Sequence, residues 1–166
     1  AAADLGAHVI NLSVGGREGY QAKQASVDYA RARGALVVAA MGNTGTYAGM
    51  SPAACKGVLA VGATTPEDTR APFSTMGVWM GVSAPGQDIL STWLRNRWVT
   101  ESGTSMATPL VARIGALMRS AHPEASVDDV IARIRSGSTD LGAPGFDEEF
   151  GQGRVDALRT LTMHDR

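Results

Sequence analysis

One segment of the chain places a serine where it could act as a nucleophile. Gly103-Thr104-Ser105-Met106-Ala107-Thr108-Pro109 puts a glycine before two hydroxyl residues, at the start of the most apolar helical pattern in the sequence. A hydroxyl there lies at the positive end of the helix dipole, beside backbone N–H groups that could bind an oxyanion. Taken alone, such a segment is more commonly a plain helix N-cap, made by Thr104 or Ser105.

A second polar residue stands at the end of an apolar run. Residues 35–40 read as a buried strand, and Met41, Gly42 and Asn43 follow directly. Loops at the carboxyl ends of strands in α/β sheets face ligands, so the Asn43 amide could donate to developing negative charge. The alternative is that Asn43 is only a turn residue between Gly42 and Gly45.

The elements that must position these residues alternate between strand and helix. Apolar runs ended by glycine predict strands, and the i, i+3, i+4, i+7 spacing of Ala22, Ala25, Ser26, Tyr29 and Ala30 predicts a helical face. The expected elements of this half are a strand covered on both faces at 9–14, a helix at 20–33, and strands at 35–40 and 58–63. Strand, helix and strand in this order predict parallel pairing with a right-handed crossover.

The second half of the chain predicts shorter strands and then three helices. The expected elements are strands at 78–83, 89–93 and 98–102, a largely buried helix at 105–121, a helix to about 135 capped by Ser126, and a helix at 155–161. No repeat or linker interrupts the pattern, so residues 1–166 are expected to form one layered α/β domain.

Composition narrows the function classes. The 166 residues are 44% hydrophobic and 19% charged, with a net charge of -1, which predicts neither a nucleic-acid nor a membrane partner. The single cysteine, Cys55, excludes an internal disulfide and reads as a small, semi-buried residue rather than a nucleophile.

Three motifs in a fixed order resemble those of the subtilase family of serine proteases. Residues 103–109 (GTSMATP) resemble its nucleophile signature, residues 37–43 (VVAAMGN) its oxyanion-hole segment, and residues 9–16 (VINLSVGG) its substrate-pairing strand. The resemblance implies a three-layer, parallel-sheet subtilisin-like fold and a serine endopeptidase that works by acyl transfer. It assigns the nucleophile to Ser105 and an oxyanion hydrogen bond to Asn43.

The resemblance also implies a peptide-binding surface. The residues it places there are Ser13, Val14, Gly15, Ala40, Met41, Gly42 and Thr104. Met41 stands where a small residue is usual in the family. No cofactor is implied. Structural calcium is common in the family, but Gly81 stands where some members carry a ligating carboxylate, so no metal site is predicted.

The catalytic aspartate and histidine of the family have no counterpart in this sequence. Both belong to segments upstream of the strand at 9–14, so the fold is expected to be incomplete, with its N-terminal part missing. That N-terminal part of the same catalytic domain is the expected partner, and the chain alone is expected to be inactive. None of the three histidines is expected to be the catalytic base. His8 precedes a strand at a position that is variable and polar in the family, His122 ends a helix before a proline, and His164 lies in the C-terminal tail. Family resemblance places the protein outside the cell or in the cell envelope.

Two other function classes share some of these features. A catalytically incomplete fragment that at most binds peptides would also lack the base, and Arg113 stands where the serine helix of the family usually has glycine. A dinucleotide-binding domain could use Gly15, Gly16 and Gly19, but no G-x-G-x-x-G follows the first strand.

Overall fold

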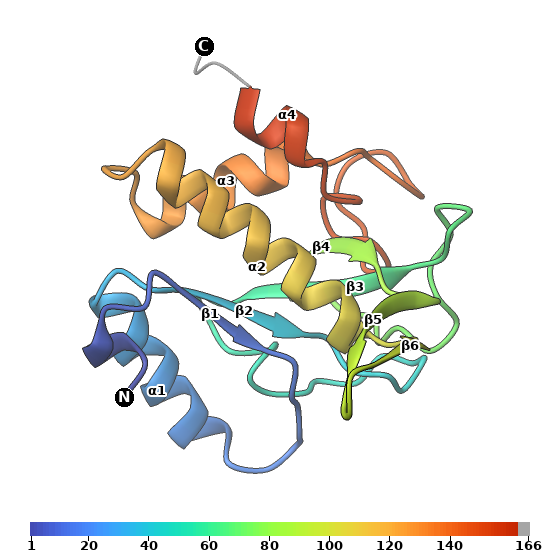
Figure 1. Cartoon of the computed structure of the whole chain (residues 1–166), viewed down its shortest axis with the longest axis horizontal. Helices are drawn as coiled ribbons and strands as arrows, with labels where there is room; N and C mark the ends of the chain where they lie inside the picture. Colours follow the sequence, from blue (N-terminus) through green and yellow to red (C-terminus); the bar gives the residue numbers. More distant parts are fainter. Residues whose placement is uncertain (163–166) are drawn as a thin grey trace.

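A parallel sheet lies between two layers of helices in the computed structural model, which describes residues 1–162 (Figure 1). The sheet has the order β1-β2-β3-β4. Its strands are β1 (Val9–Leu12), β2 (Leu36–Ala40), β3 (Leu59–Thr64) and β4 (Met80–Pro85), all parallel. A short 3-10 turn, Ala3–Leu5, precedes β1. The predicted three-layer α/β arrangement is confirmed.

The helices divide unequally between the two faces of the sheet. Helix α1 (Tyr20–Ala32) covers one face, and α2 (Thr104–Ala121), α3 (Val127–Gly137) and α4 (Ala157–Thr162) cover the other (Figure 1). A separate antiparallel hairpin of β5 (Ile89–Trp93) and β6 (Arg97–Glu101) leads into α2.

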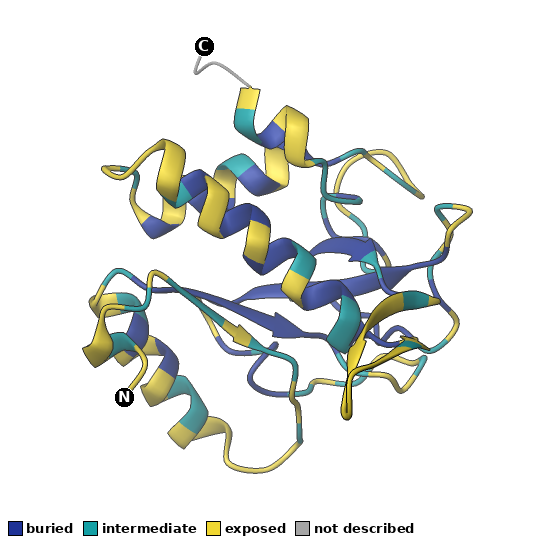
Figure 2. Cartoon of the chain, in the orientation of Figure 1, coloured by how far each residue is buried: buried dark blue, intermediate teal, exposed yellow. Residues whose placement is uncertain are grey.

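The central strands carry the core. Every residue of β2 and β3 is buried, and their alternate side chains enter two apolar clusters, one on each face of the sheet (Figure 2). Strands that are buried on both faces read as continuous apolar runs, which is why the sequence located them within a residue or two.

The first strand is less covered than its sequence predicted. β1 ends at Leu12 instead of Val14, and its residues are half-buried or exposed. Within residues 1–162 it pairs only with β2, so its other edge has no strand beside it. The prediction of a strand covered on both faces is therefore wrong for β1, because an edge strand with one neighbour leaves much of its surface to solvent.

Two helices turn different residues inward from those that their patterns suggested. In α1, Ala30 is the one residue of the predicted face that is buried, together with Val27, whereas the rest of that face is exposed, namely Ala22, Ala25, Ser26 and Tyr29. In α2, Leu117 is 42% exposed although it belongs to the predicted apolar stripe. α3 begins as predicted, with Ser126 and Asp129 forming reciprocal capping hydrogen bonds.

The thiol of Cys55 should be unreactive in the folded protein. Its side chain is 4% exposed, and burial, the largest cause, raises the pKa of the thiol above its ordinary value. Since the thiolate is the reactive form, a disulfide reagent at pH 8 should modify Cys55 slowly in buffer and fully in denaturant. Rapid modification of the native protein, followed by absorbance, would contradict the buried placement.

Candidate active site

Ser105 is held at the N-terminus of α2 by a pair of hydrogen bonds to Ser13. The Ser13 hydroxyl donates to the Ser105 carbonyl over 2.9 Å, and the Ser105 hydroxyl donates to the Ser13 carbonyl over 3.4 Å. Pro109 explains the first bond. It stands four residues after Ser105, and because proline has no backbone N–H it leaves the Ser105 carbonyl without its helical partner. The hydroxyl of Ser13, just past the end of β1, supplies the missing donor.

The side chain of Asn43 is oriented by Thr104. The backbone N–H and the hydroxyl of Thr104 donate to Asn43 Oδ1 over 3.0 and 2.9 Å, and the same hydroxyl accepts from Gly42 N over 3.1 Å. Because Asn43 Oδ1 accepts both hydrogen bonds from Thr104, the Nδ2 group of the same amide points away from Thr104. A Cβ on Gly103 would lie 3.2 Å from that nitrogen, so glycine keeps the space open.

The loop that carries Asn43 is held by the segment around Thr75. Thr75 N donates to the Gly42 carbonyl over 3.0 Å, and Thr44 N donates to the Thr75 hydroxyl over 3.1 Å. Gly42 has a φ of 101°, a conformation that side chains rarely adopt. This combination fixes the turn immediately after β2.

Two hydrogen-bond donors beside the Ser105 hydroxyl remain unused. In the part of the chain that the structure describes, neither the backbone N–H of Ser105 nor Nδ2 of Asn43 has a hydrogen-bond acceptor. The Asn43 side chain is exposed and Ser105 is half-buried, so both can be reached from solvent. A Cβ built on Gly103 would lie 3.2 Å from Asn43 Nδ2 and 3.7 Å from Ser105 N, so the two free donors lie close together at the start of α2, where they could bind an oxyanion.

The predicted peptide-binding residues separate into two groups. Val14, which is 63% exposed, and Gly15 have backbone groups with no hydrogen bond inside residues 1–162. By contrast, Ala40 and Met41 are buried, and Met41 lies in the core cluster between the sheet and α1. The prediction that Met41 lines the pocket is wrong for its side chain, because Met41, one residue past β2, continues the alternation of Val37 and Ala39 into the core.

Of the other predicted peptide-binding residues, Thr104 is placed differently from Gly42 and Ser13. Thr104 is fully buried and its hydroxyl is occupied by Asn43 and Gly42, so it is placed to orient the amide and not to touch a peptide. Gly42 and Ser13 are half-buried beside Asn43 and Ser105 and remain candidates for contact.

Comparison with known proteins decides the family. The model of the subtilase family matches residues 1–153. The chain belongs to the subtilase family. It is 41% identical over 152 residues to a thermostable alkaline protease of Halalkalibacterium halodurans, and 39% identical over 160 residues to thermitase of Thermoactinomyces vulgaris. These matches cover 92% and 96% of this chain, but 41% and 56% of the two relatives.

Solved structures agree with this assignment. A crystal structure of MycP1 with its N-terminal propeptide removed superposes with a TM-score of 0.91 at 27% identity, over 99% of this chain and 64% of that one. A lanthipeptide protease superposes with a TM-score of 0.89 at 28% identity, over 96% and 62%. The subtilase chain spans about half the length of its curated relatives, and it has the fold of these solved structures.

No histidine of this subtilase chain lies at Ser105 within the described residues. His8 precedes β1, at the end of the sheet opposite Ser13, and is exposed. His122 caps the far end of α2, about 25 Å along the helix from Ser105. His164 lies outside the described residues. Asp140 and Asp156 accept backbone N–H groups in a turn and at the start of α4, as caps and turn residues do.

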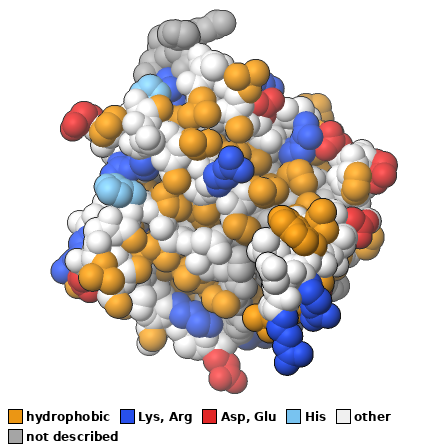
Figure 3. Space-filling view, viewed as in Figure 1, with side chains coloured by type: hydrophobic (Ala, Val, Ile, Leu, Met, Phe, Trp, Pro, Cys, Tyr) orange, Lys and Arg blue, Asp and Glu red, His pale blue; other side chains and the backbone are white. Residues whose placement is uncertain are grey.

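Between residues 1 and 162, no group of three or more His, Cys, Asp or Glu side chains could hold a metal ion. Over the same span, no helix has both the length and the apolar character to cross a bilayer. Basic side chains on the face in Figure 3 are scattered among hydrophobic and uncharged ones.

Sequence reasoning missed two features of the subtilase site. The bond from Ser13 to the Ser105 carbonyl was not predicted, although Pro109 indicates a carbonyl that needs another donor. The double bond from Thr104 to Asn43 had no signal in the sequence, because the two residues are 61 positions apart.

Replacing Ser13 should destabilise the fold more than replacing Ser105 does. Ser13→Ala leaves the Ser105 carbonyl without a donor, which should lower the free energy of unfolding by about 1 kcal/mol. Ser105→Ala removes only the longer bond and should cost less. Urea denaturation of both variants measures the difference. Equal stabilities would show that the hydrogen bond from Ser13 to the Ser105 carbonyl does not hold the N-terminus of α2.

Proposed function

We propose that this chain provides the nucleophile and the oxyanion hole of a serine endopeptidase. Ser105 Oγ attacks the carbonyl carbon of a peptide bond, and the oxyanion is bound by the Ser105 N–H and the Asn43 amide. The observation that carries the proposal is the pair of free donors, Ser105 N and Asn43 Nδ2, that lie close together at the start of the helix that carries the Ser105 hydroxyl. Membership of a protease family supports it independently.

The substrate is a polypeptide in extended conformation. The free backbone groups of Val14 and Gly15 lie just beyond Ser13, whose carbonyl contacts the Ser105 hydroxyl. An extended peptide that pairs with this segment as an added strand would bring its next carbonyl to Ser105. The relative named as a thermostable alkaline protease is consistent with such a substrate. A place outside the cell or in its envelope stays a prediction from the family resemblance.

The general base is expected from the N-terminal part of the same catalytic domain. A serine hydroxyl needs a neighbouring base to take its proton and return it to the leaving amine, and the base needs an orienting acid. The described residues supply neither beside Ser105. The greater length of the relatives supports a partner segment of this kind.

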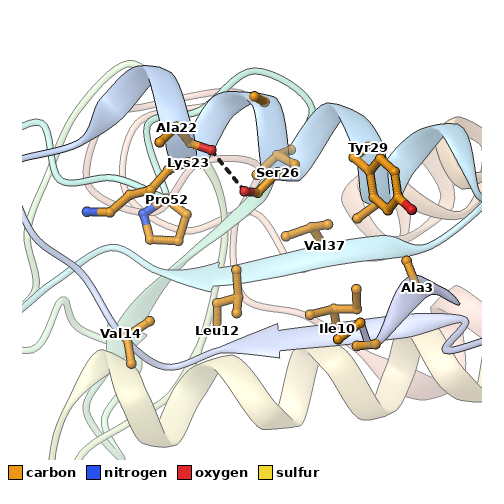
Figure 4. Close-up of a pocket in the computed structure, with 15 residues that line it drawn as sticks. Ala3, Ile10, Leu12, Val14, Ala22, Lys23, Ser26, Tyr29, Val37 and Pro52 are labelled. Atoms are coloured by element: carbon orange, nitrogen blue, oxygen red, sulfur yellow. Dashed lines mark hydrogen bonds between the residues drawn. The ribbon is translucent and has the colours of Figure 1, made fainter. Parts of the chain in front are cut away.

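The sheet and α1 present a surface on which that N-terminal part can dock. An apolar groove of about 720 Å³ separates α1 from β1, with Ile10 and Leu12 on one wall and Ala22, Ser26 and Tyr29 on the other (Figure 4). It lies beside the free edge of β1 and on the opposite face of the sheet from α2. A strand on that edge and a helix in that groove would cover both. The groove reaches Val14, so the docked part would lie next to the segment proposed to pair with the peptide.

An activity probe tests the nucleophile. A fluorophosphonate should label Ser105 in the protein that includes the N-terminal part, and should label this chain alone slower by several powers of ten, because the base is missing. Peptide mapping by mass spectrometry identifies the labelled residue.

Two variants control the labelling experiment. Ser105→Ala should abolish it, whereas Ser136→Ala, which removes an exposed hydroxyl on α3, should leave it unchanged. If the longer protein is folded but unlabelled, the chain is a fragment that at most binds peptides, and the enzymatic proposal fails.

The oxyanion role of Asn43 has its own kinetic signature. Asn43→Ala should lower kcat by about 10²–10³, which is the loss measured when such a donor is removed from subtilisin, with little change in KM. Asn96→Gly, in the β5–β6 turn at a φ of 58°, is a matched control that should keep full activity. A loss confined to KM would assign Asn43 to substrate binding alone.

A further inference from the structure

Two glycines beyond the ends of β1 and β2 bound a space, the slot, that a side chain from another segment fills. Its walls are Gly15, two residues beyond Ser13, and Gly42, one residue before Asn43. Neither wall carries a side chain, and the slot lies beside the residues that hold the Ser105 hydroxyl and the Asn43 amide.

The side chain of Met50 crosses this slot. A Cβ built on Gly42 would lie 2.5 Å from Met50 Sδ and 3.6 Å from Met50 Cγ. A Cβ built on Gly15 would lie 3.5 Å from Met50 Cε and 3.8 Å from Met50 Cβ. The thioether therefore packs against both glycine walls and fills the space between them, while Met50 itself remains half-buried.

The next residue anchors Met50 in this position. Ser51 forms two backbone hydrogen bonds with Gly16, each 3.0 Å long, and its hydroxyl donates to the Gly16 carbonyl over 3.1 Å. The Lys23 ammonium donates to the carbonyls of both Gly16 and Ser51, over 3.4 and 3.3 Å. The backbone that carries Met50 is thus tied to the backbone that carries Gly15.

We propose that Met50 closes the pocket for the side chain that precedes the cleaved bond, and thereby restricts this protease to small residues such as alanine or serine at that position. The inference rests on the proposed function. A carbonyl held between Ser105 Oγ and Asn43 Nδ2, with its preceding backbone along Val14 and Gly15, directs its own side chain between the two glycine walls. Met50 occupies the depth that a phenylalanine ring would need.

The size of the effect follows from the chemistry of an apolar pocket. Each methylene that a pocket gains or loses changes discrimination by about 10- to 200-fold. A methionine adapts its shape more readily than a branched side chain, but here its length is packed between fixed backbone walls.

Shortening Met50 should enlarge the accepted residue. In the protein that includes the N-terminal part, kcat/KM is measured for two peptide anilides that differ only in alanine or phenylalanine before the cleaved bond. The native protein should prefer alanine. Met50→Gly should raise the phenylalanine-to-alanine ratio by about 10- to 200-fold, and Met50→Ala should raise it less. Leu117→Ala, which removes a similar apolar volume from the outer side of α2, should leave the ratio unchanged.

The outcomes separate this inference from the proposed function. If the native protein cleaves the alanine peptide but the Met50 variants keep its ratio, the pocket assignment is overturned and the protease stands. If the native protein cleaves neither peptide, the protease itself fails.

In that second case, binding decides the role of Met50. This chain is labelled with ¹³C at its methionine methyls, and the Met50 signal is identified by its loss in Met50→Ala. Acetylated tetrapeptide amides ending in alanine should shift this signal, and those ending in phenylalanine should not. Equal shifts, or none, would overturn the inference.

Discussion

The structure depends on the hydrogen bonds between Ser13 and Ser105, which join the end of β1 to the beginning of α2. The two residues are 92 positions apart in the sequence. Pro109 makes the contact necessary, because it withholds the N–H that would otherwise satisfy the Ser105 carbonyl within the helix. Because this one backbone donor is missing, the Ser13 hydroxyl replaces it and fixes the N-terminus of α2 to the end of β1. The residues that follow β1 are proposed to bind the peptide.

A second tie holds the other side of the site. Thr104 directs the Asn43 amide by occupying its oxygen twice, and the sheet order places the ends of β1 and β2 side by side so that both ties meet at α2. Hydrogen bonds of this kind act by fixing geometry, since each contributes only about 1 kcal/mol to stability. Their value lies in donors that are already oriented before a charge develops.

The two faces of the sheet are covered to different extents. The α2 face is filled by a continuous apolar cluster that holds the helix of the proposed nucleophile, whereas the α1 face leaves an apolar groove beside an unpaired strand edge. An uncovered edge and groove are unusual for an isolated domain, because both invite pairing with another segment. This asymmetry is consistent with a chain that spans about half the length of its relatives.

The sequence by itself determined the elements and which residues are proposed to react. Buried strands, a capped helix and a serine at a helix mouth are local patterns, so they could be predicted for β2, β3, α3 and Ser105 from neighbouring residues. Only the tertiary structure decided which side chains face the site. Met41 points into the core, Thr104 lies beneath Asn43, and Met50 fills the slot between Gly15 and Gly42. These placements depend on contacts between distant segments, and no spacing within one segment records such contacts.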